Sequence, residues 1–113
     1  MAKDDYHVIV YRFLSYLYAC LKKGIRTDPK TFERGGPVFG WIPESYMQFV
    51  YKTLKEEKFI SGLSVEWYED DMHVEGLEYM SITPLGIEYL TDNSLMERVK
   101  RFMKDIKATT PGM

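Results

Sequence analysis

The sequence has little cysteine, no long apolar run and no sign of a targeting segment. A single cysteine, Cys20, excludes an internal disulfide framework and is expected to be a half-buried apolar residue in a reducing compartment. No stretch approaches the roughly 18 consecutive apolar residues of a membrane span. The acidic pair at residues 4–5 and the internal Arg12 argue against a signal peptide. We therefore expect a cytoplasmic protein without a membrane partner.

Histidine is also scarce, and this limits the chemistry that the chain can perform. His7 and His73 are far apart in the sequence, so a zinc or iron site is not expected. The acidic run before His73, residues 70–71, is more typical of a solvated turn than of an acid–base pair. Gly35-Gly36 is followed by no Gly-Lys-Ser/Thr, which argues against a nucleotide site. We expect no enzyme activity, no catalytic residue, no cofactor and no small-molecule substrate.

Positive charge is missing from the middle of the chain. Residues 59–97 contain no Lys or Arg and nine Asp or Glu, whereas residues 98–113 carry five Lys or Arg and one Asp. Charge asymmetry of this kind bears on partners rather than on fold.

The 45% hydrophobic content in 113 residues is enough for one core.

Helical periodicity organises the first half. Apolar side chains recur at helical spacing over residues 5–22, which Asp4 or Asp5 can cap and Gly24 ends. Asp28-Pro29 predicts a short helix over 29–34. A third helix is predicted over residues 43–58, with Pro43 in its first turn and three apolar side chains on one face: Met47, Val50 and Leu54. The apolar residues 38–42 between them are expected to form a short strand or a core plug that buries Trp41.

A β-hairpin and two helices follow. Residues 59–67 and 73–82 are predicted strands, joined by a turn at 68–72 and kinked at Gly76. Thr83-Pro84 predicts a short helix, in which Gly86 suggests that another backbone passes close by. Ser94 and Glu97 form a capping box for a last helix that ends near residue 108.

This order predicts an α+β fold of the winged helix-turn-helix class, with three N-terminal helices, a hairpin wing and two C-terminal helices. A single domain is expected over residues 1–108, followed by a flexible tail over 109–113.

The exposed face of the helix 43–58 is the candidate for binding double-stranded DNA, because the corresponding helix of a winged helix enters the major groove. The same residues could equally form a solvated helix face with ordinary i, i+4 pairs. The residues expected to contact DNA are Ser45, Gln48, Lys52 and Lys55 on this helix, and Lys22, Lys23, Arg26, Lys30 and Arg34 before it.

The acidic wing argues against the usual DNA pose, since carboxylates at its tip would be repelled by phosphates. These carboxylates are Glu66, Glu69, Asp70, Asp71 and Glu75. The alternative is a protein-interaction module, either a homodimer or a complex with another protein. Its contact surfaces would be the wing and the tyrosine-rich first helix, and the basic last helix could dock on the wing of a second copy.

The run Tyr79-Met-Ser-Ile-Thr-Pro-Leu-Gly-Ile-Glu-Tyr-Leu90 resembles the passage from wing to next helix in many winged-helix proteins. Together with Gly40-Trp-Ile-Pro-Glu44 and Phe59-Ile-Ser-Gly62, it makes nearly the whole chain resemble the YjcQ-like family of small Gram-positive bacterial and prophage proteins. The resemblance implies a winged-helix fold and a bacterial or phage origin. It implies no activity, so no functional residue is carried over from the family.

Overall fold

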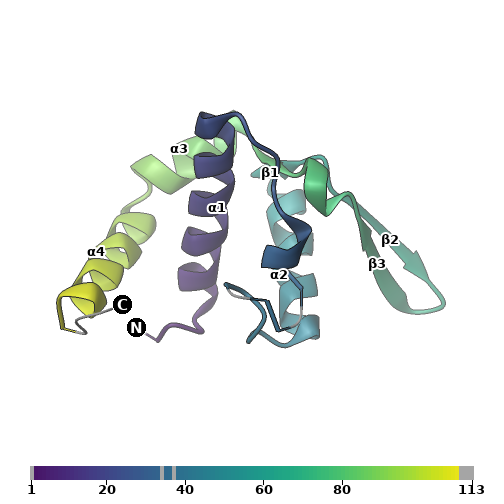
Figure 1. The fold of residues 1–113 in the computed structure, drawn as a ribbon, viewed down its shortest axis with the longest axis horizontal. Coiled ribbons are helices and arrows are strands. Elements are labelled where there is room, and N and C mark those ends of the chain that lie inside the picture. Colours follow the sequence, from purple (N-terminus) through teal and green to yellow (C-terminus); the bar gives the residue numbers. More distant parts are fainter. Residues whose placement is uncertain (1, 34, 37, 110–113) are drawn as a thin grey trace.

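A computed structural model describes residues 2–33, 35–36 and 38–109, with side chains as far as Asp105. The chain is an α+β protein with four α-helices and two short antiparallel strand pairs in these ranges (Figure 1). The elements in chain order are α1 (Tyr6–Lys23), η1 (Pro29–Thr31), α2 (Glu44–Glu56), β1 (Ile60–Ser61), β2 (Ser64–Tyr68), β3 (Asp71–Glu75), η2 (Leu77–Tyr79), β4 (Ser81–Ile82), α3 (Pro84–Asp92) and α4 (Ser94–Thr109).

The core surrounds α1 and includes side chains of α2, β1, β4 and α4. The apolar stripe of α1 is buried from Val8 to Cys20, whereas Leu21 near its end is 48% exposed, and Phe13 at its centre is 0% exposed. The ring of Phe13 lies 5.1 Å from that of Phe32, after η1, and 5.8 Å from those of Phe39 and Tyr51. One aromatic cluster therefore joins α1, η1, the following loop and α2. The prediction that Met47, Val50 and Leu54 face the core is confirmed.

The ends of α1 follow local signals only in part. Gly24 adopts a left-handed conformation (φ 68°) and ends α1 as predicted. Asp5 is the N-cap residue, but its carboxylate accepts a hydrogen bond from the Ala2 N–H instead of from the helix. The cysteine of α1, Cys20, is fully buried rather than half-buried.

The second predicted helix, over residues 29–34, is a single 3₁₀ turn, so the N-terminal part has two α-helices rather than three. The Asp28 carboxylate caps this turn by accepting from the Lys30 N–H, as expected. Residues 38–42 form a core plug rather than a strand, with Phe39 and Ile42 buried. The prediction that Trp41 is buried is wrong: it is 45% exposed, because Phe39 and Ile42 fill the core instead, and its indole N–H donates to the Val38 carbonyl at the surface.

The predicted hairpin is divided into two parts. At its base β1 pairs with β4, and beyond this β2 pairs with β3 around a turn at Glu69 and Asp70, which both have positive φ. The predicted single strand over 73–82 is wrong, because Gly76 (φ 84°) and η2 interrupt it. Gly62 on the other strand also has a left-handed backbone (φ 85°), and its Cα packs against the Tyr79 carbonyl. These two glycines form a joint between base and tip.

The C-terminal helices begin at local caps. The Thr83 hydroxyl accepts from the Gly86 N–H, which confirms the predicted start of α3. A Cβ at Gly86 would lie 2.3 Å from the Phe59 carbonyl oxygen, so the predicted close approach is also confirmed. At the start of α4 the predicted capping box is wrong. The cap is Asn93, whose side-chain oxygen accepts from the N–H groups of Leu95 and Met96.

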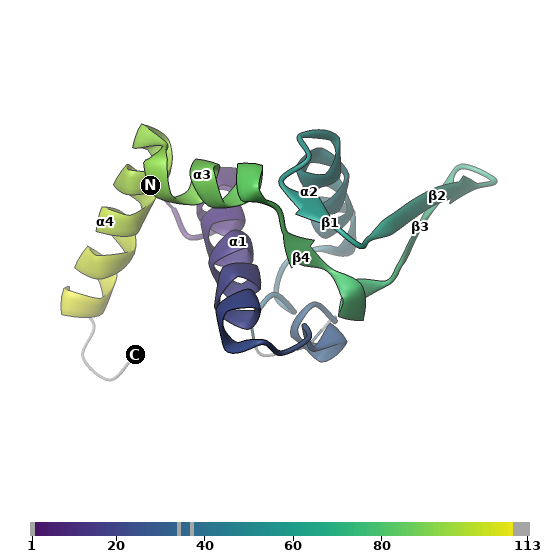
Figure 2. The same cartoon turned by 90° about the horizontal axis from the view of Figure 1, so that it is seen from above.

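The elements follow one another along the long axis of the molecule. Figures 1 and 2 both show α4 at one end, then α1, then α2, with the β2–β3 hairpin projecting at the other end. Helix α4 is anchored by Met96 and Val99, which are both 0% exposed. No helix in the described ranges is long and apolar enough to span a membrane. The predicted tail, apart from Thr109 at the end of α4, lies outside the described residues.

Candidate binding surface on α2 and the hairpin

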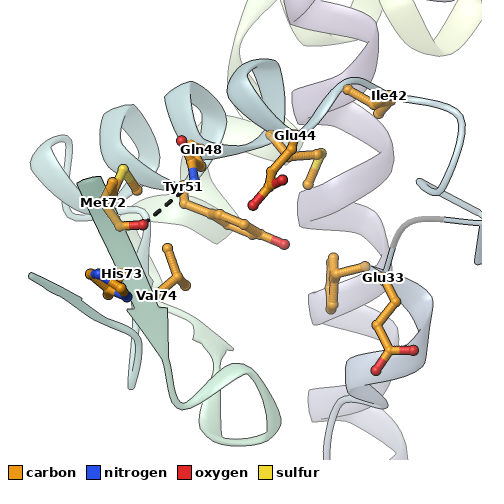
Figure 3. A pocket seen from close by; sticks show the side chains of 10 residues that line it. Glu33, Ile42, Glu44, Gln48, Tyr51, Met72, His73 and Val74 are labelled. Atoms are coloured by element: carbon orange, nitrogen blue, oxygen red, sulfur yellow. Dashed lines mark hydrogen bonds between the residues drawn. The ribbon is translucent and has the colours of Figure 1, made fainter. Parts of the chain in front are cut away.

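Three of the four predicted DNA-contacting residues of α2 lie on its outer side. Ser45, Lys52 and Lys55 are exposed. Gln48 is half-buried, and its side-chain Nε2 donates a 3.5 Å hydrogen bond to the Met72 carbonyl of β3 (Figure 3). Because Gln48 leans on the hairpin, it is less free than the two lysines to reach into a groove of DNA.

The other predicted basic residues make no described contact with the exposed residues of α2. Lys22 lies over the Tyr18 ring and lines a groove between α1 and α4, on the side of α1 opposite α2 (Figure 1). Arg26 lies over the Tyr79 ring of η2. Lys23 is exposed at the end of α1, and Lys30 is exposed in η1. Arg34 lies outside the described residues.

The surface formed by α2 and the hairpin is strongly acidic. Residues 44–79 contain nine Asp or Glu and three Lys, a net charge of −6. The basic residues of α4 lie at the other end of the long axis (Figure 1), with the exposed side chains Arg98, Lys100, Arg101 and Lys104. The charge asymmetry of the sequence is therefore a charge separation in space.

The β2–β3 hairpin has one apolar and one polar face. The register pairs Val65 with Val74 and Trp67 with Met72, and these four side chains share one face. The valines and Met72 pack against the core, whereas Trp67 is 59% exposed near the tip.

The polar face of the hairpin carries the carboxylates. There the Tyr68 hydroxyl donates to the Glu66 carboxylate, and this hydrogen bond raises the pKa of Tyr68. The ring of Tyr68 also lies 5.0 Å from that of His73. Because Tyr68 is 56% exposed on this face and Trp67 is exposed on the other, the acidic tip presents one large aromatic side chain to solvent on each face.

A cavity of about 410 Å³ opens between α2 and β3. Its walls come from three elements, which are α2, β3 and the segment after η1 (Figure 3). Tyr51 points from α2 into the cavity, with the Glu44 carboxylate turned toward it and Glu33 on the facing wall. Burial raises the pKa of the Tyr51 hydroxyl above its usual range, so this hydroxyl stays neutral at physiological pH.

The residues that could do acid–base or metal chemistry are dispersed. His7 in α1 has a buried Nδ1 with no hydrogen-bond partner in the described part of the chain, and His73 lies on the hairpin. Among the described residues, no group of three or more His, Cys, Asp or Glu side chains is placed to hold a metal ion.

Two features of this region escape the sequence analysis. The cavity has no sequence signal, because its walls come from three separate segments. The exposed aromatic pair does have a sequence signal. Trp67 and Tyr68 directly precede the acidic turn, and side chains at a hairpin tip are too far from the core to pack on it.

Comparison with known proteins gives one result. The family model described as "YjcQ protein" matches residues 11–109, which is most of the chain, and confirms the resemblance inferred from the sequence. No curated protein and no solved structure matches the chain.

Proposed function

The chain belongs to the YjcQ protein family, and we propose that it is a protein-interaction module on a winged-helix scaffold, whose acidic hairpin is the wing and binds a basic partner protein. Two of the elements of a winged helix are present in the required order, a polar-faced helix (α2) followed by a hairpin. Fold alone does not determine function, so the proposal depends on the surface of these elements.

The charge separation carries the proposal. A net charge of −6 over residues 44–79 attracts a basic surface and repels the phosphates of nucleic acid. The exposed rings of Trp67 and Tyr68 can add binding energy that charge alone does not provide, because large aromatic side chains contribute most of the binding energy in many interfaces. Charge would guide the partner to the wing, and the exposed Trp67 side chain would hold it there, with Tyr68 offering a second contact on the opposite face of the hairpin.

The proposal predicts that Trp67→Ala weakens a wing complex. The immobilised protein should retain a basic partner from an extract of cells that contain the gene, and the purified partner should bind the variant about 30-fold more weakly. Isothermal titration calorimetry measures this ratio. Leu85→Ala is the matched control, since Leu85 is 48% exposed on α3, away from the wing. Equal affinities of the two variants, or no partner that depends on the wing, would contradict the proposal.

DNA binding through α2 is a second candidate, favoured by the exposure of Ser45, Lys52 and Lys55 on one side of the helix. Its geometry would keep the acidic wing away from the duplex. The bacterial or prophage origin implied by the family resemblance makes a regulatory role on DNA the natural context for this candidate.

If α2 binds DNA, reversing the charges of Lys52 and Lys55 together should abolish binding to mixed duplex fragments at low salt. The log–log slope of affinity against salt for Lys52→Ala/Lys55→Ala should fall by about 2, because two phosphates would no longer be neutralised by a lysine. Fluorescence anisotropy measures both effects. Lys22→Glu/Lys100→Glu in the groove between α1 and α4 is the control. Loss of binding in this control alone would place DNA on the opposite side of α1, and no binding at low salt would exclude this candidate.

A further inference from the structure

The cavity between α2 and β3 has the size and walls of a small-molecule site. Its volume of about 410 Å³ lies within the range of natural ligand pockets. About half of its wall surface is apolar, and this part is lined by Phe32, Ile42, Met47, Met72 and Val74. The apolar half of the wall suits a ligand with an apolar body.

The charge of the cavity is of one sign. Glu33 and Glu44 line it, His73 is the one basic side chain among the described lining residues, and no Lys or Arg is among them. Neither carboxylate has an ion-pair or hydrogen-bond partner among the described residues. A ligand anion would meet two uncompensated carboxylates, whereas a cation would provide the missing partner.

Aromatic rings strengthen this preference. Tyr51 is 6% exposed and its ring packs edge-on to that of Phe32, with 6.3 Å between centroids, so two π-systems form one corner of the cavity. A cation near such rings is attracted by their negative faces. The neutral Tyr51 hydroxyl can also accept a hydrogen bond from an ammonium group.

We propose that this cavity binds a small organic cation, an amine or quaternary ammonium with an apolar body, between α2 and the wing. The ligand would contact Tyr51 and Glu44 on one side and Met72 on the other, next to the hydrogen bond from Gln48 to the Met72 carbonyl. Binding would therefore fasten the hairpin to α2. The proposal is independent of any partner protein or DNA, because the exposed rings of Trp67 and Tyr68 lie outside the cavity walls.

Three probes with one apolar body separate charge from hydrophobicity: 4-phenylbutylamine, 4-phenylbutan-1-ol and 4-phenylbutanoate. The amine should bind roughly tenfold more tightly than the alcohol at low salt, since each exposed carboxylate contributes up to about fivefold. The butanoate should bind most weakly. Methyl NMR signals of Met47 and Met72 should shift, whereas that of Met96, buried at α4, should not.

Removing the charges of Glu33 and Glu44 tests whether they cause the preference for the amine. Glu33→Gln/Glu44→Gln should bind amine and alcohol equally well and leave the affinity for the alcohol unchanged, and both positions are exposed, so the fold is retained. Glu56→Gln is the matched control on the same helix, where Glu56 is exposed outside the cavity. Equal binding of amine and alcohol by the native protein overturns the proposal, as does a shift confined to other methionines or no binding at millimolar probe.

Discussion

Replacing Phe13 with alanine should lower the free energy of unfolding by about 3–5 kcal/mol, the range for truncating a fully buried phenylalanine. Phe13 is 0% exposed and its ring contacts those of Phe32, Phe39 and Tyr51. The cavity left by the ring would therefore lie where α1, η1, the core plug and α2 meet. A loss of this size is a large part of the roughly 5–15 kcal/mol that stabilises a domain.

Urea unfolding followed by circular dichroism measures this loss. Phe49→Ala is the matched control, because Phe49 lies on α2 but is 53% exposed and makes one ring contact, edge-on to Tyr6. We expect this control to cost no more than about 1 kcal/mol. Similar losses for the two variants would mean that the aromatic cluster around Phe13 is not the centre of the core.

Local signals in the sequence predict much of the fold. Helix α1 and its end at Gly24, the core face of α2 and the Thr83 cap all depend on residues near one another in sequence or on helical periodicity. The close approach at Gly86 involves the distant Phe59 carbonyl, and its sequence signal is a glycine inside a helix. The error at the start of α4 is local, because Asn93 rather than the neighbouring Ser94 is the cap. The other errors arise where non-local contacts decide. Trp41 has the composition of a core residue, but Phe39 and Ile42 fill the core instead and leave it at the surface.

The candidate site is predicted less completely, for the same reason. The exposed face of α2 follows from helical periodicity, so Ser45, Lys52 and Lys55 are placed correctly on the outer side. Whether Lys22 and Arg26 lie on the same surface as these residues depends on how α1 lies between α2 and α4, and helical periodicity does not indicate this arrangement. The cavity depends on how the hairpin lies against α2, and at the base of the hairpin the backbone of Gly62 lies against the distant carbonyl of Tyr79.

That contact predicts a large effect for Gly62→Ala. Gly62 has a left-handed backbone, and an added Cβ would lie 2.0 Å from the Tyr79 carbonyl oxygen, well inside van der Waals contact. Gly24 provides a matched comparison, since it is also left-handed (φ 68°) but an added Cβ would meet no atom within 4 Å. We expect Gly24→Ala to cost about 1 kcal/mol for backbone strain alone and Gly62→Ala roughly 3 kcal/mol or more, because strain and overlap add.

Urea unfolding of both variants measures this difference, and amide hydrogen exchange shows where it acts. In Gly62→Ala the extra cost should appear as faster exchange in β2 and β3, because the joint formed by Gly62 and Gly76 holds the hairpin at its angle to α2. The hydrogen bond from Gln48 to the Met72 carbonyl should break when that angle changes, and the cavity between them should open. Equal costs for the two variants would show instead that the hairpin takes its position from side-chain packing on α2, and that its backbone joint is free to adjust.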